Sequence, residues 1–230
     1  MNRLKSTRRA PGRPTGVPRA LGALSTLLAP WAIAHGATLS AMADQYLDFN
    51  DNLVPPGWKL RRQSDSGPCG VGHHRFFAGQ TNGACTLSSS LEVAPGTGTL
   101  TVAWKGNLQH DGHAHHQEVT LSTPTGSGIV VRVAPSSTPG SQAGFLTVIS
   151  DNMGEVLQFS TWPDGTYHFH LRVTQNQLRF TGRVDGRRAI DYSRQLISVK
   201  PDQIKRVQLG VEQSIGEDQW MDNVSIKQRP

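Results

Sequence analysis

Histidine is the residue type in this sequence that most suggests chemistry. Four of the nine histidines lie between Gln109 and Gln117, namely His110, His113, His115 and His116. Neutral imidazole is a common ligand of zinc, copper and nickel, so this segment is a candidate transition-metal site. The alternative, which the Asp111-Gly112 turn signal favours, is a polar hairpin turn with solvated histidines. A specific site would need a further ligand from elsewhere in the chain.

A second pair of histidines lies in a segment that alternates between apolar and polar residues. The apolar positions are Tyr167, Phe169, Leu171 and Val173. Because a strand repeats every two residues, His168, His170 and Arg172 share the opposite face. On an open sheet face these side chains would hydrogen-bond sugar hydroxyls, or transfer protons if the protein is an enzyme. The alternative for both histidines is a structural role.

The acidic residues do not form the paired carboxylates that glycoside hydrolysis requires. Glu217 and Asp218 are the nearest pair, and consecutive residues of a strand point to opposite faces. The sequence also lacks a G-x-S-x-G elbow and an H-E-x-x-H site. These observations favour binding over hydrolysis.

Two further side chains are candidates for a site. Asp222 shares its parity with Trp220, Val224 and Ile226, so strict alternation points this carboxylate inward, where it needs a partner. One such partner is a set of backbone N–H groups at a bulge. Trp162 precedes a Pro-Asp-Gly turn, and we predict that it is exposed and stacks on a sugar ring.

The pattern of the first 43 residues predicts a cleaved secretory signal peptide. Six basic residues and no acid precede a short apolar run, 20–34, which is followed by Ala41-Met42-Ala43. The run is too short for a membrane span, which needs about 20 residues. The chain has 23 basic and 17 acidic residues, so residues 44–230 carry 17 of each. This balance gives no reason to expect nucleic acid as a partner, and we predict a periplasmic or secreted protein.

Two cysteines, Cys69 and Cys85, remain after the leader. In an oxidising compartment such a pair is most simply one disulfide. Closing a loop of this length would stabilise the fold by about 3 kcal/mol.

The pattern of residues 44–230 is that of strands with almost no helix. Short alternating runs at 99–104, 129–133, 167–173 and 207–211 are separated by turn residues every eight to twelve positions. This pattern predicts one all-β domain, a two-sheet antiparallel sandwich of about 12 or 13 strands.

Three motifs then point to a known superfamily. They are the hairpin run that begins Asp164-Gly165-Thr166-Tyr167-His168, the final segment Trp220-Met221-Asp222-Asn223-Val224, and the opening Asp48-Phe49-Asn50-Asp51 with Pro56-Gly57-Trp58. Together they resemble the concanavalin A-like lectin/glucanase superfamily, including laminin-G-like domains, over nearly the whole of residues 44–230.

This resemblance implies a jelly roll whose concave face often binds glycans. It implies a structural Ca²⁺ held by Asp222 with Asp48, Asn50 or Asp51, and oxygen ligands suit this ion. The E-x-D-x-x-E strand of the glucanase members is absent. Polysaccharide lyases on similar jelly rolls use His, Tyr, Arg and Gln, for which His168, His170, Arg172 and Gln117 are candidates.

The sequence therefore predicts an exported, lectin-like domain that binds a polysaccharide or other glycan without catalysis. Trp162, His168, His170 and Arg172 are the predicted ligand-binding residues. One alternative is a polysaccharide lyase or glycoside hydrolase that uses His168, His170 and Arg172. The other is a structural, adhesion or histidine-loop metal-binding domain.

Overall fold

The computed structural model describes residues 44–63, 67–79, 81–126, 128–215 and 218–230. The predicted signal peptide lies outside these residues. Fifteen strands and one 3-10 turn, Pro201–Gln203, are formed by the described residues. None of these residues belongs to a helix long and apolar enough to cross a membrane.

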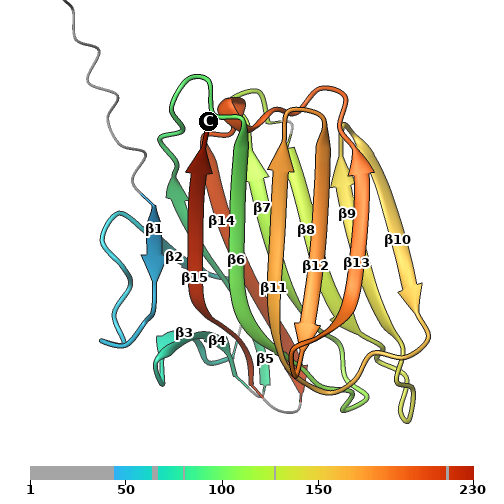
Figure 1. Cartoon of the computed structure of the whole chain (residues 1–230). Coiled ribbons are helices and arrows are strands. Elements are labelled where there is room, and N and C mark those ends of the chain that lie inside the picture. Colours follow the sequence, from blue (N-terminus) through green and yellow to red (C-terminus); the bar gives the residue numbers. More distant parts are fainter. Residues whose placement is uncertain (1–43, 64–66, 80, 127, 216–217) are drawn as a thin grey trace, which may run out of the picture. The chain divides into compact units, whose positions relative to one another are not determined.

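The strands form two antiparallel sheets that face each other (Figure 1). The first sheet runs in the order β13 (Arg187–Gln195), β12 (Gln177–Val184), β11 (Gly165–Thr174), β6 (Thr99–Leu108), β15 (Gln219–Arg229), β4 (Arg75–Ala78) and β3 (Cys69–Gly72), and β1 (Gln45–Leu47) also pairs with β15. The second runs in the order β10 (Met153–Phe159), β9 (Gly144–Ser150), β8 (Gly128–Pro135), β7 (His115–Ser122), β14 (Arg206–Ile215), β5 (Thr81–Ser90) and β2 (Lys59–Arg62).

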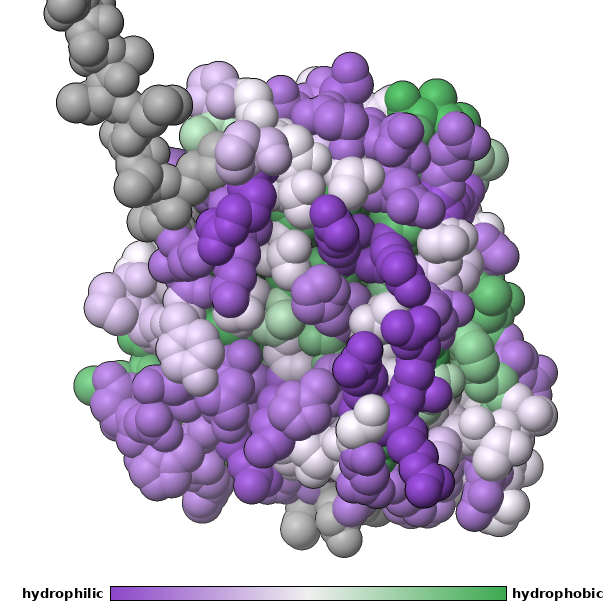
Figure 2. Space-filling view, in the orientation of Figure 1, coloured by the Kyte–Doolittle hydropathy of each residue, from purple (hydrophilic) through white to green (hydrophobic). Residues whose placement is uncertain are grey.

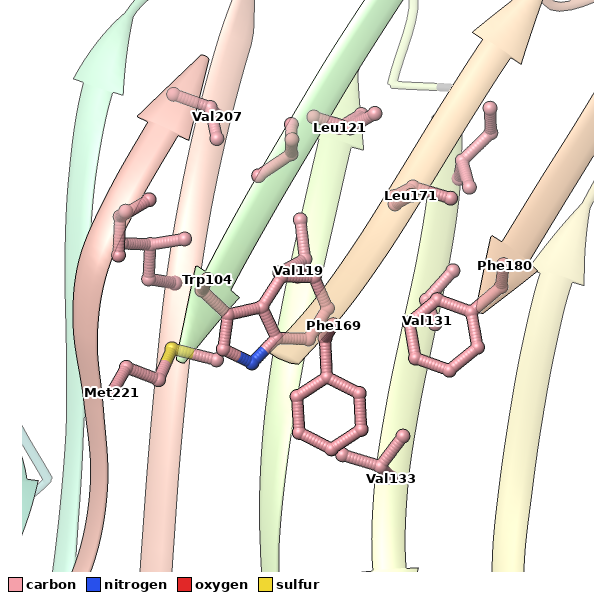
Figure 3. Packing of buried hydrophobic residues seen from close by; sticks show 14 of the residues in the cluster. Trp104, Val119, Leu121, Val131, Val133, Phe169, Leu171, Phe180, Val207 and Met221 are labelled. Carbon is pink, nitrogen blue, oxygen red and sulfur yellow. The ribbon is translucent and has the colours of Figure 1, made fainter. Parts of the chain in front are cut away.

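Alternation of buried and exposed residues places the core between the sheets. In β11 the side chains of Tyr167, Phe169, Leu171 and Val173 are buried, as the period of two predicts. Phe169 stacks on Phe180 of β12 with ring centroids 5.7 Å apart, and Trp104 of β6 lies 5.1 Å from Phe169 (Figure 3). Valines of the second sheet, such as Val119 and Val131, complete this core (Figure 3).

The predicted fold class is confirmed: the protein is an all-β sandwich with two antiparallel sheets. The Cys69–Cys85 disulfide is also confirmed, and it joins β3 of the first sheet to β5 of the second. The strand number exceeds the predicted 12 or 13. Four short strands, β1 to β4, have only three or four residues each, which is too short to produce a clear alternating pattern.

Candidate ligand-binding face

The outer face of the first sheet carries the residues that the sequence singled out on β11. His168 lies opposite Lys105 of β6 on one side and Arg183 of β12 on the other. His170 lies between Ala103 and Thr181 in the next row. Hydrophilic side chains cover most of this face (Figure 2). The prediction that His168 and His170 share an exposed face is confirmed.

A hollow of about 400 Å³ lies over these strands. It is lined by Ala103, Trp104, Lys105, His168, Phe169, His170, Thr181, Arg183 and Asn223. The small side chains of Ala103 and Thr181 flank His170 and leave room beside the imidazole. The volume lies within the range that small-molecule sites occupy, about 300–1,000 Å³.

The hollow is lined by two cations, Lys105 and Arg183, and by no carboxylate, although Asp222 of β15 lies opposite Lys105 in the strand register. Among the described residues, no carboxylate lies within ion-pair distance of Lys105 or Arg183. The four Arg–carboxylate pairs in this part of the chain involve Arg132, Arg179, Arg188 and Arg229. Burial, and then the charges of Arg172, Arg179, Arg183 and Lys227, lower the pKa of His170. At neutral pH its imidazole is therefore uncharged, with one nitrogen that donates a hydrogen bond and one that accepts.

Arg172 shares this face but does not line the hollow. It lies one row further along β11, between Thr101 and Arg179. Arg179 is held by two hydrogen bonds to Asp191 of β13, at 3.1 and 3.0 Å. Arg172 therefore extends the cationic surface beyond the hollow.

Trp162 does not lie on any open face, and the prediction of an exposed stacking platform is wrong. Its side chain is 1% exposed. The ring packs against Phe159 and Tyr167, with centroids 5.6 and 6.3 Å away. It also covers Gly144, where any Cβ atom would lie 1.3 Å from the Trp162 ring. Trp162 is a core residue.

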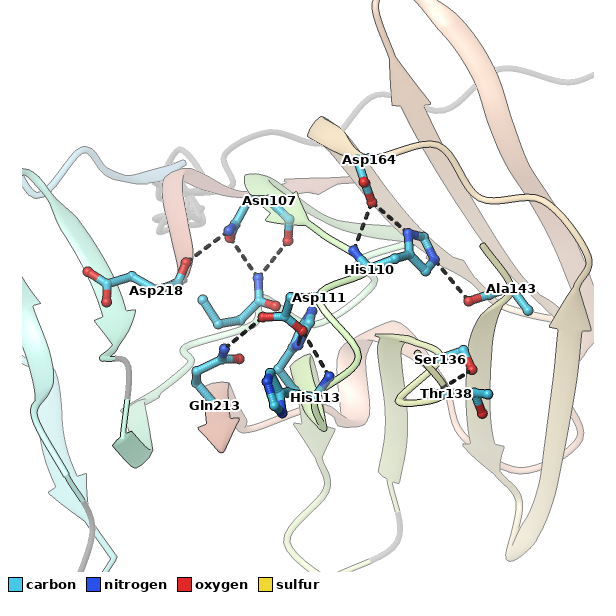
Figure 4. Close-up of polar contacts among 12 residues, drawn as sticks. Asn107, His110, Asp111, His113, Ser136, Thr138, Ala143, Asp164, Gln213 and Asp218 are labelled. Carbon is cyan, nitrogen blue, oxygen red and sulfur yellow. Dashed lines mark hydrogen bonds and ion pairs between the residues drawn. The ribbon is translucent and has the colours of Figure 1, made fainter. Parts of the chain in front are cut away.

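The histidine-rich segment does not gather its imidazoles. His110 lies between Asp164 and the carbonyl of Ala143, with its Nδ1 2.6 Å from Asp164 Oδ1 and its Nε2 2.9 Å from that carbonyl (Figure 4). His115 begins β7 and points inward, whereas His116 points to the outer face of the second sheet, 3.8 Å from Glu212. In the described part of the chain, no group of three or more His, Cys, Asp or Glu side chains could hold a metal ion. The expected hairpin turn with solvated histidines is also wrong, because the Asp111-Gly112 segment connects β6 of the first sheet to β7 of the second and the side chains of His110 and His115 are buried. Within this segment the His113 N–H donates to Asp111 Oδ1.

The carboxylates predicted to bind calcium are engaged separately. Asp48 accepts hydrogen bonds from Asn50, and Asp51 accepts one from the N–H of Leu53. Asp222 accepts a bond from the side chain of Asn223, and its Oδ1 is buried without a hydrogen-bond partner in the described structure. Asp222 thus has one unsatisfied oxygen, but the three carboxylates do not form a common group. The calcium site of Asp222 with Asp48, Asn50 or Asp51 therefore stays a prediction.

A buried polar network was not predicted from the sequence. Asn107 of β6 accepts hydrogen bonds from the side chains of Gln117 and Gln219 and donates one to the carbonyl of Asp218 (Figure 4). Gln117 also accepts a bond from Trp104 Nε1. Gln117 is fully buried, so its assignment to a lyase site together with His168 is wrong. The signal for this network was available in the sequence: alternation along β7 places the polar residues His115 and Gln117 on the core face, where they need hydrogen-bond partners.

A cluster on the outer face of the second sheet was also missed. Glu118 lies opposite Gly210, and Glu212 lies opposite His116, so the two glutamates are diagonal neighbours on β7 and β14, about 7 Å apart. Burial first, and then the charge of Arg132, lower the pKa of His116. Glu118 already accepts two hydrogen bonds from Arg132, at 2.7 and 3.0 Å. Glu118 and Glu212 are far apart in the sequence and become neighbours only through the pairing of β7 with β14, so the sequence alone did not indicate this pair.

No protein-family model matches the sequence, and no curated protein matches it. Several solved structures are similar in fold. They include the CBM2 module of the evolved Dit protein of Lactobacillus casei phage J-1, which has a TM-score of 0.62 and 16% identity over 79% of this chain and 93% of that one.

A second is a β-glucanase of Bacillus licheniformis, with a TM-score of 0.54 and 11% identity over 81% of this chain and 98% of that one. A third is the carbohydrate recognition domain of Emp47p, with a TM-score of 0.55 and 11% identity over 83% of this chain and 97% of that one. At these identities the likeness concerns the fold alone. The protein has the concanavalin A-like jelly-roll fold.

Proposed function

We propose that this protein is an exported carbohydrate-binding domain without catalytic activity, and that its ligand lies on the outer face of the first sheet. The observation that carries this proposal is the hollow over β6, β11 and β12, where Lys105, His170 and Arg183 meet without a carboxylate pair. Fold neighbours named as a CBM2 module and a carbohydrate recognition domain support the ligand class.

The groups that line the hollow suit sugar hydroxyls. Lys105 and Arg183 only donate hydrogen bonds, whereas Thr181, Asn223 and the neutral imidazole of His170 both donate and accept. Such a mixed set of donors and acceptors matches sugar hydroxyls, because each hydroxyl also donates and accepts hydrogen bonds. Trp104 and Phe169 belong to the core, so neither offers an exposed ring face for stacking.

The spacing of carboxylates argues against hydrolysis on this face. Asp191 on β13 and Asp222 on β15 are four strands apart, about 19 Å, and hydrolysis requires roughly 5–9.5 Å. On the other sheet Glu118 and Glu212 are close enough, but Glu118 is occupied. Besides Arg132, it accepts a hydrogen bond of 3.0 Å from the Thr120 hydroxyl.

The binding proposal is tested by electrophoresis of the purified protein through gels cast with a panel of neutral and acidic polysaccharides. We expect at least one polysaccharide to retard the protein. The double substitution His170→Gln with Arg183→Gln should weaken that retardation about tenfold or more. Arg187→Gln, at the start of β13 and outside the hollow, is the matched control for loss of one charge and should change little.

The enzyme alternative is tested with the same panel. A timed digest should release neither reducing ends nor unsaturated ends from the polysaccharide that is bound. Release that is abolished by His170→Gln would establish a lyase on the first sheet. Release that is abolished by Glu118→Gln would establish a hydrolase on the second sheet, and either result would replace the present proposal.

Export is part of the same proposal. It rests on the basic and apolar leader and on Ala41-Met42-Ala43, and the Cys69–Cys85 disulfide is consistent with an oxidising compartment. N-terminal sequencing of the protein recovered from outside the cytoplasm should begin at Asp44. A chain that retains Met1 would contradict this part of the proposal.

A further inference from the structure

A larger groove lies on the outer face of the second sheet, away from the face described above. Its volume is about 980 Å³, and it runs over β2, β5 and β14. The lining residues are Lys59, Leu60, Arg61, Arg62, Gln63, Thr86, Ser88, Arg206 and Gln208.

The groove exists because its floor is made of small side chains. Arg61 lies opposite Thr86, which in turn lies opposite Gly210 of β14. In the next row Lys59 lies opposite Ser88, which lies opposite Gln208. Long cationic side chains on β2 thus face a floor that carries hydroxyl groups and a glycine. Arg206 forms the far side, where it donates a hydrogen bond of 3.1 Å to the Ser88 hydroxyl.

The charge of the groove is uncompensated. Four of the nine lining residues are cations, Lys59, Arg61, Arg62 and Arg206, and none is acidic. All four are exposed, and no carboxylate of the described residues pairs with any of them. Arg132, on the same face, is by contrast paired with Glu118. A concentration of like charge in a chain whose residues 44–230 are neutral in sum attracts anionic ligands to this groove.

We propose that this groove binds a polysaccharide that carries carboxylate or sulfate groups. Guanidinium groups match both anions with two parallel hydrogen bonds. The hydroxyls of Thr86 and Ser88 and the amide of Gln208 then bind the sugar hydroxyls between the charges. Lys59 and Arg61, two residues apart on one strand, are spaced by about 7 Å. Arg206 lies two strands away and one row beyond Lys59, about 12 Å from it along the backbone grid. Several cations at fixed spacings suit a polymer that repeats its anion.

Other polyanions fit the groove less well. No Trp, Tyr, Phe or His side chain lines it, so bases of single-stranded nucleic acid would have no ring on which to stack. A membrane surface would need exposed apolar side chains, and Leu60, which is partly buried, is the one large apolar lining residue. The site uses other residues and another sheet than the proposed function, with which it shares only the general class of ligand.

The test measures affinity of the purified protein for two matched pairs of polymers. Polygalacturonate is compared with its fully methyl-esterified form, and dextran sulfate with dextran. We expect the charged member of at least one pair to bind at least tenfold more tightly than the neutral member. Raising the salt from about 50 mM to 500 mM should weaken this binding strongly, because exposed charges are screened.

Variants locate the site. Arg61→Gln and Arg206→Gln should each weaken binding of the charged polymer about tenfold, whereas Arg187→Gln and the first-sheet pair His170→Gln with Arg183→Gln should not. Circular dichroism verifies that each variant is folded. Equal binding of charged and neutral polymers, or full binding by the Arg61→Gln/Arg206→Gln double variant, would overturn the inference. Duplex DNA that competes as well as the charged polysaccharide would also overturn it.

The outcome is separable from that of the proposed function. If glycan binding is lost in the first-sheet variants and unchanged in the groove variants, the proposed function stands and the groove inference fails. If the charged polymer binds and only the groove variants lose it, the inference stands. The first-sheet site fails if, in addition, no polysaccharide of the panel binds the first-sheet variants more weakly than the native protein.

Discussion

The contact between Gly144 and Trp162 predicts a strong energetic coupling. A Cβ atom at Gly144 would lie 1.3 Å from Cε3 and 2.3 Å from Cδ2 of Trp162, so the ring occupies the space of the missing side chain. Gly144→Ala therefore forces the ring out of its place. Trp162 is tied to this region through its backbone as well, because its N–H donates to the carbonyl of Gln142 at 2.7 Å.

The expected magnitudes follow from burial and overlap. Trp162→Ala removes a side chain that is 1% exposed and should cost about 3–5 kcal/mol of the free energy of unfolding. Gly144→Ala alone should cost about 3 kcal/mol, at the upper end for overpacking, because the overlap is with a rigid ring. In the Trp162→Ala background the added methyl enters the cavity, so Gly144→Ala should cost about 1 kcal/mol or less.

Urea unfolding of the four proteins, followed by circular dichroism, measures this coupling as a double-mutant cycle. We expect a coupling free energy of about 2 kcal/mol in the direction of mutual relief. Costs that add within about 0.5 kcal/mol would refute the packing of Trp162 on Gly144. A cost below about 1 kcal/mol for Trp162→Ala would refute its burial. The folded Trp162→Ala protein should bind its glycan as the native protein does.

Three further predictions concern stability. Reduction of the Cys69–Cys85 disulfide should lower the free energy of unfolding by about 3 kcal/mol in urea titrations with and without dithiothreitol, and an unchanged midpoint would contradict this. Asp151→Asn should cost about 1–2 kcal/mol at pH 7, because the Ser198 hydroxyl and N–H donate to Asp151 Oδ1 and the Ile197 N–H donates to Oδ2, and the NH2 group of an amide cannot accept on the second side. Urea unfolding at that pH measures the cost, and a cost near zero would show that these bonds contribute nothing. Burial lowers the pKa of His115, so the unfolded chain binds more protons below pH about 6.5 and stability should fall as the pH drops. His115→Gln should reduce that fall between pH 7.5 and 5.5, and a fall equal to that of the native protein would show that His115 does not contribute.

Alternation was sufficient to predict the face of β11. His168, His170 and Arg172 lie on its outer side because four apolar neighbours of opposite parity are buried. The strand partners could not be predicted in this way. That Lys105 and Arg183 flank His168 depends on the pairing of β11 with β6 and β12, which is a property of the assembled sheet.

The errors have identifiable physical causes. Trp162 precedes a turn, a position that usually suggests exposure, but the absence of a side chain at Gly144 opens a space into which the ring folds. The histidine segment connects the two sheets rather than closing a hairpin, and β7 begins at His115, so alternation separates His115 from His116. A contact between segments distant in sequence decided the first case, and alternation from His115 onward decided the second.

The central claim is that the open face over β6, β11 and β12 binds a glycan without cleaving it. The most direct test is calorimetric titration of the native protein and of the His170→Gln/Arg183→Gln variant with the polysaccharide that retards the protein most in gels. The account predicts saturable binding by the native protein, at least tenfold weaker binding by the variant, and an intact polysaccharide afterwards. Equal affinity of the two proteins, or cleaved polysaccharide after the titration, would contradict it.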